Sequence, residues 1–163
     1  MSDARELHCY QYVTVPYDKV RDALSRDATG IFQRATTSAT SRAKEIVATL
    51  WAGAGGTEIG RDVTIAVRGV NEKTSALGDR TTELEIAWSA TSAPGLFPSM
   101  EATLSVYPLS SKETQIDLHG HYRPPLGLVG NAIDAVAGHR IAEASVLRFV
   151  QDVAACINSE LGN

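Results

Sequence analysis

The chain has 163 residues, of which 44% are hydrophobic and 21% are charged, and its formal net charge is -4. This length suits one globular domain over residues 1–163, and the 15 lysines and arginines are scattered singly, which argues against nucleic acid or anionic lipid as a partner. The N-terminus has no apolar signal core, and no run of about 18 apolar residues could span a bilayer. The sequence therefore predicts a cytoplasmic protein without integral membrane association.

The first predicted element is a strand over residues 7–15, where residues such as Leu7 and Cys9 alternate with residues such as His8 and Tyr10. Pro16 ends this strand and suits the first turn of a short helix. Val20, Ala23 and Leu24 would lie on one apolar face of that helix. A second short helix is expected between Asp27 and Thr37.

The next segment is expected to be extended. The run from Ala43 to Trp51 contains Ile, Val, Thr and Trp and predicts a strand. A glycine-rich turn at residues 53–57 leads to another predicted strand from Ile59 to Val70. This turn lacks the lysine and the following helix of a phosphate-binding loop, so it is interpreted as a hairpin.

Three further strands show clean two-residue alternation, over 81–90, 100–107 and 113–123. Such alternation is typical of an antiparallel sheet with one buried face. The chain then breaks at Pro124-Pro125, and residues 128–161 have helical spacing. Projection at 100° per residue predicts one apolar stripe on this helix, formed by Leu128, Ala135, His139, Ala142, Val146, Phe149, Val150, Val153 and Ile157.

This order of elements resembles the START-like helix-grip (SRPBCC) superfamily, which includes lipid-transfer domains, pollen allergens and aromatic polyketide cyclases. Residues 13–24 look like its first strand-to-helix junction, and 104–109 followed by 113–116 look like its late hairpin. Residues 122–127, leading into 138–145, are similar to an uncharacterised bacterial subgroup. The resemblance implies an α+β fold, with a curved antiparallel sheet of six to seven strands around a long C-terminal helix and two short helices after the first strand.

The resemblance also implies that the first strand neighbours the last and that a cavity lies between the sheet and the final helix. It carries no catalytic residue onto this chain. Small residues such as Ala102, Gly120, Ala135 and Ala142 favour some empty space over a solid interior. The residues expected to contact a ligand are Trp88, Met100, Leu104, Leu118, Tyr122, His139, Ala142, Val146 and Phe149.

The expected cavity wall has few polar side chains. His139 could bond a ligand carbonyl or act as a general base, or it could serve as a packing residue bonded to a loop, and we expect no second polar side chain to converge on it. Trp88, Tyr122 and Gln11 each bring a hydrogen-bond donor and could orient the polar end of a ligand or bond to backbone. No catalytic residue is assigned.

His119 and His121 lie two residues apart on a predicted strand and face the same side, and pairing of the first and last strands would bring His8 opposite His121. These histidines could bind a metal ion, but we favour the interpretation that they are exposed side chains without a ligand role. No metal and no cofactor are therefore predicted. Cys9 and Cys156 have no metal-binding spacing and are expected to be reduced thiols that pack as small apolar groups.

The sequence therefore predicts a module that binds a hydrophobic small molecule, such as a lipid, a quinone or a polyketide-like compound, in an internal cavity. A cyclase or dehydratase acting on an aromatic or polyketide-like substrate is the first alternative, with His139 and Tyr122 as its polar groups. A protein-interaction domain with a filled core is the second. The ligand, the pathway and the oligomeric state, a homodimer included, stay open.

Overall fold

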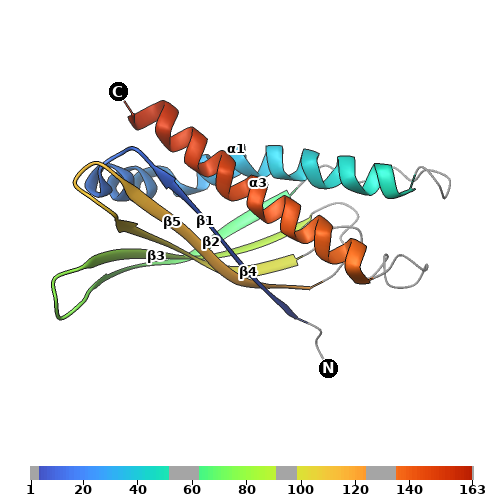
Figure 1. The fold of residues 1–163 in the computed structure, drawn as a ribbon, viewed down its shortest axis with the longest axis horizontal. Helices are drawn as coiled ribbons and strands as arrows, with labels where there is room; N and C mark the ends of the chain where they lie inside the picture. Colours follow the sequence, from blue (N-terminus) through green and yellow to red (C-terminus); the bar gives the residue numbers. More distant parts are fainter. Residues whose placement is uncertain (1–3, 52–62, 91–98, 124–134, 163) are drawn as a thin grey trace.

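The computed structural model of the chain describes residues 4–51, 63–90, 99–123 and 135–162. Its elements are β1 (Arg5–Val13), α1 (Tyr17–Trp51), β2 (Val63–Thr74), β3 (Arg80–Ala90), β4 (Ser99–Pro108), β5 (Thr114–Arg123) and α3 (Ala135–Leu161). The five described strands form one antiparallel sheet in the order β1-β5-β4-β3-β2, so the first strand pairs with the last. Figure 1 shows α1 and α3 together on one face of this curved sheet.

The topology confirms the expected α+β arrangement, but the sheet has five strands in the described part of the chain rather than six to seven. The predicted strand over residues 43–51 is wrong, because these residues form the C-terminal end of α1. Ile46, Val47 and Leu50 in this segment are spaced i, i+1 and i+4, which fits a helical face as well as a strand. The β-branched residues therefore did not decide the conformation, and α1 continues along α3.

A kink at Asp27 divides α1, and it marks the expected start of the second helix. Asp27 has non-helical backbone angles, φ -150° and ψ 45°, and the amide of Gly30 donates to its Oδ1 at 3.1 Å. This is the geometry of an N-cap, in which a short carboxylate accepts a hydrogen bond from an otherwise unpaired amide of the first turn. The second half of the helix then extends well beyond Thr37, where the sequence predicted its end.

The alternating strands place their apolar residues under the two helices. Every second residue of β3, β4 and β5 is buried, and the intervening residues are exposed or half-buried. The buried set contains all nine of the side chains that alternation predicts to face inward: Val13, Ile86, Trp88, Met100, Ala102, Leu104, Ile116, Leu118 and Tyr122. The core thus lies between the concave face of the sheet and the helix pair.

The C-terminal helix contributes an apolar stripe to this core. Val146, Phe149, Val150, Val153 and Ile157 are all buried, as the helical projection predicts. The Phe149 ring lies edge-on to Trp88 of β3, with ring centroids 5.5 Å apart, and to Phe32 of α1 at 5.7 Å. Phe149 therefore joins the sheet to both helices. Within the described ranges, no helix is long and apolar enough to cross a membrane.

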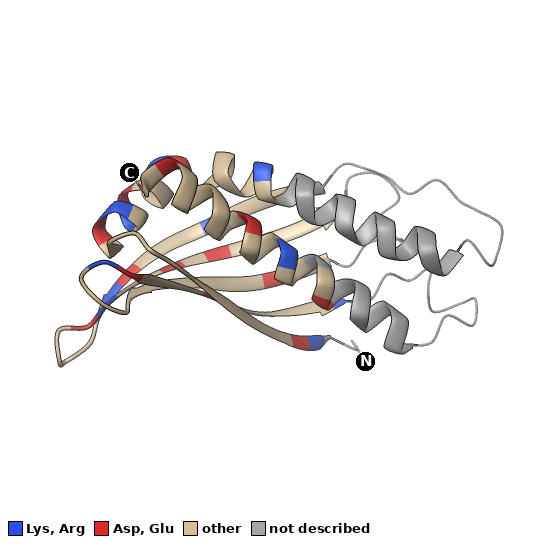
Figure 2. Cartoon of the chain, turned by 45° about the horizontal axis from the view of Figure 1, so that its top comes forward, with Lys and Arg blue, Asp and Glu red and all other residues tan. Residues whose placement is uncertain are grey.

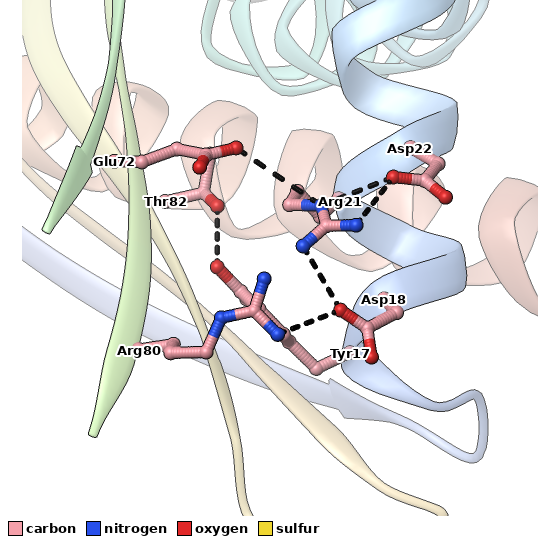
Figure 3. Close-up of polar contacts among 7 residues, drawn as sticks. All are labelled: Tyr17, Asp18, Arg21, Asp22, Glu72, Arg80 and Thr82. Atoms are coloured by element: carbon pink, nitrogen blue, oxygen red, sulfur yellow. Dashed lines mark hydrogen bonds and ion pairs between the residues drawn. The ribbon is translucent and has the colours of Figure 1, made fainter. Parts of the chain in front are cut away.

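The start of α1 is fixed to the hairpin between β2 and β3 (Figure 3). The Tyr17 hydroxyl lies 2.6 Å from Thr82 Oγ1, and both residues are buried. Asp18 accepts from Arg21 and from Arg80, each at 2.9 Å. The Arg80 guanidinium also lies over the Tyr17 ring, 5.2 Å from its centroid. Since the charges in this cluster are paired with one another, we interpret it as a structural anchor.

Gly120 allows β5 to approach β4 closely. A Cβ atom at Gly120 would lie within 3 Å of Ala102 Cβ, Glu101 O and Ala102 Cα. A side chain at that distance would force the two strands apart, so this position favours glycine. Gly120 therefore serves close approach between strands, which differs from its expected role as a residue that leaves space in the interior.

Candidate functional site

The concave face of the sheet carries a transverse row of side chains near the end where β5 stops. The paired residues Ile65, Trp88, Met100, Tyr122 and Arg5 follow one another across β2, β3, β4, β5 and β1. The middle three are buried, and each was predicted as a ligand contact. The row therefore places the Trp88 indole and the Tyr122 phenol on the same wall, two strands apart.

Trp88 brings an unsatisfied polar group into this wall. The residue is 4% exposed, and its Nε1 has no hydrogen-bond partner in the part of the chain that the structure describes. Leaving a buried donor without an acceptor costs about 1–3 kcal/mol. The indole N–H of Trp88 is thus a buried hydrogen-bond donor for which the described residues supply no acceptor.

Tyr122 is a second side chain with a polar group in this row. Burial raises the pKa of its phenol above the ordinary value, and this effect outweighs the charge of Arg5 and a hydrogen bond with the same side chain, which lower the pKa. Glu143 of α3 is close enough to raise the pKa further. At neutral pH Tyr122 is therefore a neutral phenol, suited to hydrogen bonding rather than to proton abstraction.

A groove of about 510 Å³ lies between β1 and α3. Its lining comes from four successive residues of β1 and from one flank of the helix: Glu6, Leu7, His8, Cys9, Glu143, Ala144, Val146 and Leu147. Leu7 and Val146 are also core residues, so the floor of the groove is part of the apolar interior. Because β1 is the edge strand, this groove opens the seam between sheet and helix.

Small side chains continue from this groove across the sheet. Leu7 pairs with Gly120, Gly120 with Ala102, and Ala102 with Ile86. The side chains of glycine and alanine project least from a sheet. This row is therefore shallow between the two neighbouring rows, whose larger side chains include Tyr122 and Leu118. Ala102 keeps 9% of its surface accessible although it belongs to a central strand beneath the helices.

The structure gives the positions of most of the predicted ligand contacts. Trp88, Met100, Leu104, Leu118 and Tyr122 are buried on the concave face, and Val146 and Phe149 are buried on α3. Val146 also lines the groove. His139 and Ala142 belong to α3, but their side chains lie outside the described residues, as do those of Ala135 and Leu128. The expectation that His139 has no convergent polar partner stays a prediction.

The three histidines of β1 and β5 lie on the opposite, outer face. The predicted pairing is wrong by two residues, because His8 is opposite His119, and His121 is opposite Glu6. His8 Nε2 lies 2.6 Å from Asp117, and His119 Nε2 lies 2.5 Å from Glu6. The hydrogen bond and charge of His119 lower the pKa of Glu6. Among the described residues, no group of three or more potential ligands could hold a metal ion.

A second hollow, of about 380 Å³, lies over the outer face of the sheet. Small residues such as Ala66 and Ala87 line it, together with Trp88, Met100 and charged residues that include Arg68, Glu101 and Arg123. Arg68 donates to Glu101 at 3.0 Å, and both side chains are more than half exposed. Figure 2 shows the two signs of charge interspersed along the described chain. This solvated surface suits an apolar ligand less well than the seam beside α3.

Both cysteines are free thiols, as expected, and each is partly buried. Cys9 lies on β1 at the groove, where burial, and to a smaller extent the charge of Asp117, raise its pKa to about 11. The thiolate is the reactive form, so this environment suppresses the reactivity of Cys9. Cys156 lies beside Arg34 and Glu160, and burial raises its pKa as well.

The Cys9 thiol is expected to react with iodoacetamide at pH 8 about 100-fold more slowly in the folded than in the unfolded chain, given a pKa of about 11 against a model value of 9.0. Between pH 9 and pH 11, the two pKa values of this thiol, the folded chain binds more protons than the unfolded chain. Its free energy of unfolding should therefore fall as the pH rises through this range. Peptide mass spectrometry gives the labelling rate of each cysteine separately. Equal Cys9 rates in folded and unfolded protein, or an unchanged pH dependence of unfolding in Cys9→Ala, would contradict this assignment.

Sequence reasoning missed Arg5 and the groove. The predicted strand began at Leu7, whereas β1 begins at Arg5. Extending the same alternation by two residues would have placed Arg5 on the inward face. The contribution of Glu143 and Leu147 depends on how α3 lies against the sheet edge, which the sequence pattern does not specify.

No family model matches the chain, and no curated protein sequence matches it. Solved structures similar to it include the ZhuI aromatase/cyclase from Streptomyces sp. R1128, with 15% identity, 98% of this chain and 94% of that chain covered, and a TM-score of 0.47. Another is TTHA0849 from Thermus thermophilus, at 10% identity, with coverage of 95% and 98% and a TM-score of 0.46. A third is norcoclaurine synthase from Thalictrum flavum, at 9% identity, with coverage of 98% and 89% and a TM-score of 0.42.

Proposed function

We propose that this chain is a single-domain binding module that holds an apolar small molecule between the concave face of the sheet and α3. The groove beside β1 carries this proposal. Its volume of about 510 Å³ falls within the range of about 300–1,000 Å³ that is typical of small-molecule sites. Its apolar floor is continuous with the protein core through Leu7 and Val146.

The expected affinity follows from the area that such a ligand would bury. Removing about 300 Å² of apolar ligand surface from water contributes roughly 7 kcal/mol before the cost of immobilising the ligand is subtracted. This favours micromolar binding with few polar contacts. Lipids, quinones and polyketide-like aromatic compounds all meet this requirement.

We assign no reaction to the site. Tyr122 is a protonated phenol at neutral pH, and burial raises its pKa further above the ordinary value, so it suits hydrogen bonding to an oxygen of the ligand. The imidazoles of His119 and His121 lie on the outer face of the sheet. His8 lines the groove, but its Nε2 is paired with Asp117 at 2.6 Å. These features support binding without chemistry.

Filling the groove with a larger side chain is expected to weaken the binding of a hydrophobic dye, Nile red, by about tenfold or more. Ala144 lines the groove and is half-buried, so an Ala144→Trp indole would occupy the space that the dye needs. Ala155→Trp is the matched control, because it adds the same side chain to an exposed position of the same helix. Fluorescence titration of the three proteins gives the affinities.

Equal weakening by both variants, or by neither, would place the dye elsewhere and oppose the proposed site. Native mass spectrometry of protein purified from its native host then identifies the natural ligand. A co-purified apolar molecule that is lost in Ala144→Trp and kept in Ala155→Trp supports the proposal. A host protein without such a molecule, together with a negative dye titration, would overturn it.

A further inference from the structure

The buried polar side chains of the described interior are satisfied with one exception. The Thr82 hydroxyl is paired with Tyr17 at 2.6 Å, and Thr114 donates to the carbonyl of Val15 at 2.7 Å. Tyr122 has a hydrogen bond with Arg5. The indole nitrogen of Trp88 is the only buried side-chain nitrogen or oxygen in the described chain that lacks a partner. Natural proteins rarely leave such a group without a reason.

The surroundings of Trp88 limit what could accept its proton. Its neighbours across the sheet are Ile65 and Met100, and the edge of its ring system meets Phe149. These side chains offer no strong acceptor. A bound molecule that supplied the acceptor would have to be otherwise apolar to lie among these side chains.

The row of small residues lies beside the row that contains Trp88 on the concave face. It runs from Leu7, which lines the groove, through Gly120 to Ala102 in the middle of the concave face. Ile86, which pairs with Ala102, is two residues from Trp88 on the same face of β3. A ligand that extended inward from the groove along this row would meet the indole, and the neighbouring Phe149 presents an aromatic surface.

We propose that the ligand is a ring compound with a carbonyl-type oxygen, and that the indole N–H of Trp88 donates a hydrogen bond to this oxygen. This inference rests on the proposed function and narrows its ligand class. An acceptor oxygen on an aromatic or quinone-like ring meets both requirements, since the ring packs against Phe149 while the oxygen satisfies Trp88. A purely hydrocarbon chain leaves the donor unpaired.

The test uses two probes of the same shape, 9-fluorenone and fluorene, which differ by a carbonyl in place of a methylene group. Competition against bound Nile red measures both affinities in the wild-type protein and in Trp88→Phe. The preference for 9-fluorenone over fluorene is expected to be about tenfold greater in the wild type than in Trp88→Phe, which corresponds to one hydrogen bond of about 1.4 kcal/mol. Fluorene should bind the two proteins with similar affinity.

A second replacement covers the case in which Trp88→Phe does not fold. In a Trp51→Phe background, position 88 can carry β-(3-benzothienyl)alanine, in which sulfur replaces the indole N–H and the shape is kept. The infrared carbonyl band of bound 9-fluorenone gives an independent readout. It should lie at lower frequency in the tryptophan protein than in the benzothienyl protein, because a hydrogen bond weakens the C=O bond, and a purely structural role of Trp88 would not change it.

The outcomes separate the two proposals. A preference and a carbonyl shift that both require the indole N–H support the inference. Binding of both probes with the same preference and the same carbonyl band after replacement of Trp88 overturns the inference and leaves the proposed function standing. Failure of the wild-type protein to bind either probe or Nile red overturns both.

Discussion

Phe149→Ala is expected to lower the free energy of unfolding by about 3–5 kcal/mol, as is typical when a fully buried aromatic ring is removed. Phe149 is 0% exposed and contacts the rings of Trp88 and Phe32, so one side chain joins α3 to β3 and to α1. Its loss removes both aromatic contacts and leaves a cavity at the centre of three elements. Guanidinium chloride denaturation followed by circular dichroism measures the change.

Leu147→Ala is the matched control for this prediction. Leu147 lies on the same helix but is 40% exposed, so its truncation should cost less than about 1 kcal/mol. A typical domain of this size is stable by about 5–15 kcal/mol, so Phe149→Ala should still fold at low temperature. A loss for Phe149→Ala as small as that for Leu147→Ala would show that the aromatic contact does not hold α3 on the sheet.

The strands that could be predicted from sequence are those with one buried and one exposed face. In β4, buried Met100, Ala102 and Leu104 alternate with Glu101 and Thr103, so local pattern and tertiary environment agree. The segment over 43–51 offers no such contrast between polar and apolar positions, and its short apolar run suits a helix or a strand. Its helical state follows from being the continuation of α1 along α3.

The error in strand pairing has a simple physical cause. The two-residue alternation of a strand fixes which face each side chain takes, but it does not fix how far one strand slides along its partner in steps of two. His8 was expected opposite His121 and lies opposite His119, and both registers keep the histidines on the outer face. The faces could therefore be predicted, whereas the contacts of His8 and His119 with Asp117 and Glu6 could not.

The candidate site was partly accessible to the same reasoning. Alternation placed Trp88 and Tyr122 on the inward face as polar donors, and both are buried there. What could not be predicted is that Trp88 lacks a partner while Tyr122 has Arg5, because satisfaction of a buried donor depends on three-dimensional neighbours. The groove depends on the spacing between an edge strand and a helix more than 120 residues later in sequence.

Gly120→Ala is expected to destabilise the fold by about 1–3 kcal/mol, because the added methyl group has no room between β4 and β5. Its Cβ would overlap Ala102 Cβ and would lie 2.6 Å from the carbonyl oxygen of Glu101. The second contact is with backbone, which can retreat only if the two strands separate. Ala102→Gly should therefore rescue Gly120→Ala only in part, and chemical denaturation of the single and double variants measures this.

Gly69→Ala provides the contrasting case in the same sheet. The nearest atom to a Cβ at Gly69 is Glu85 Oε2 at 3.8 Å, an ordinary contact with a flexible side chain. Alanine also reduces the conformational freedom of the unfolded chain, so this variant should be unchanged or more stable by up to about 1 kcal/mol. If the two glycine variants had equal stability, the close approach of β4 and β5 at Gly120 would be disproved. If only Gly120→Ala loses stability, the close approach of β4 and β5 depends on this one glycine.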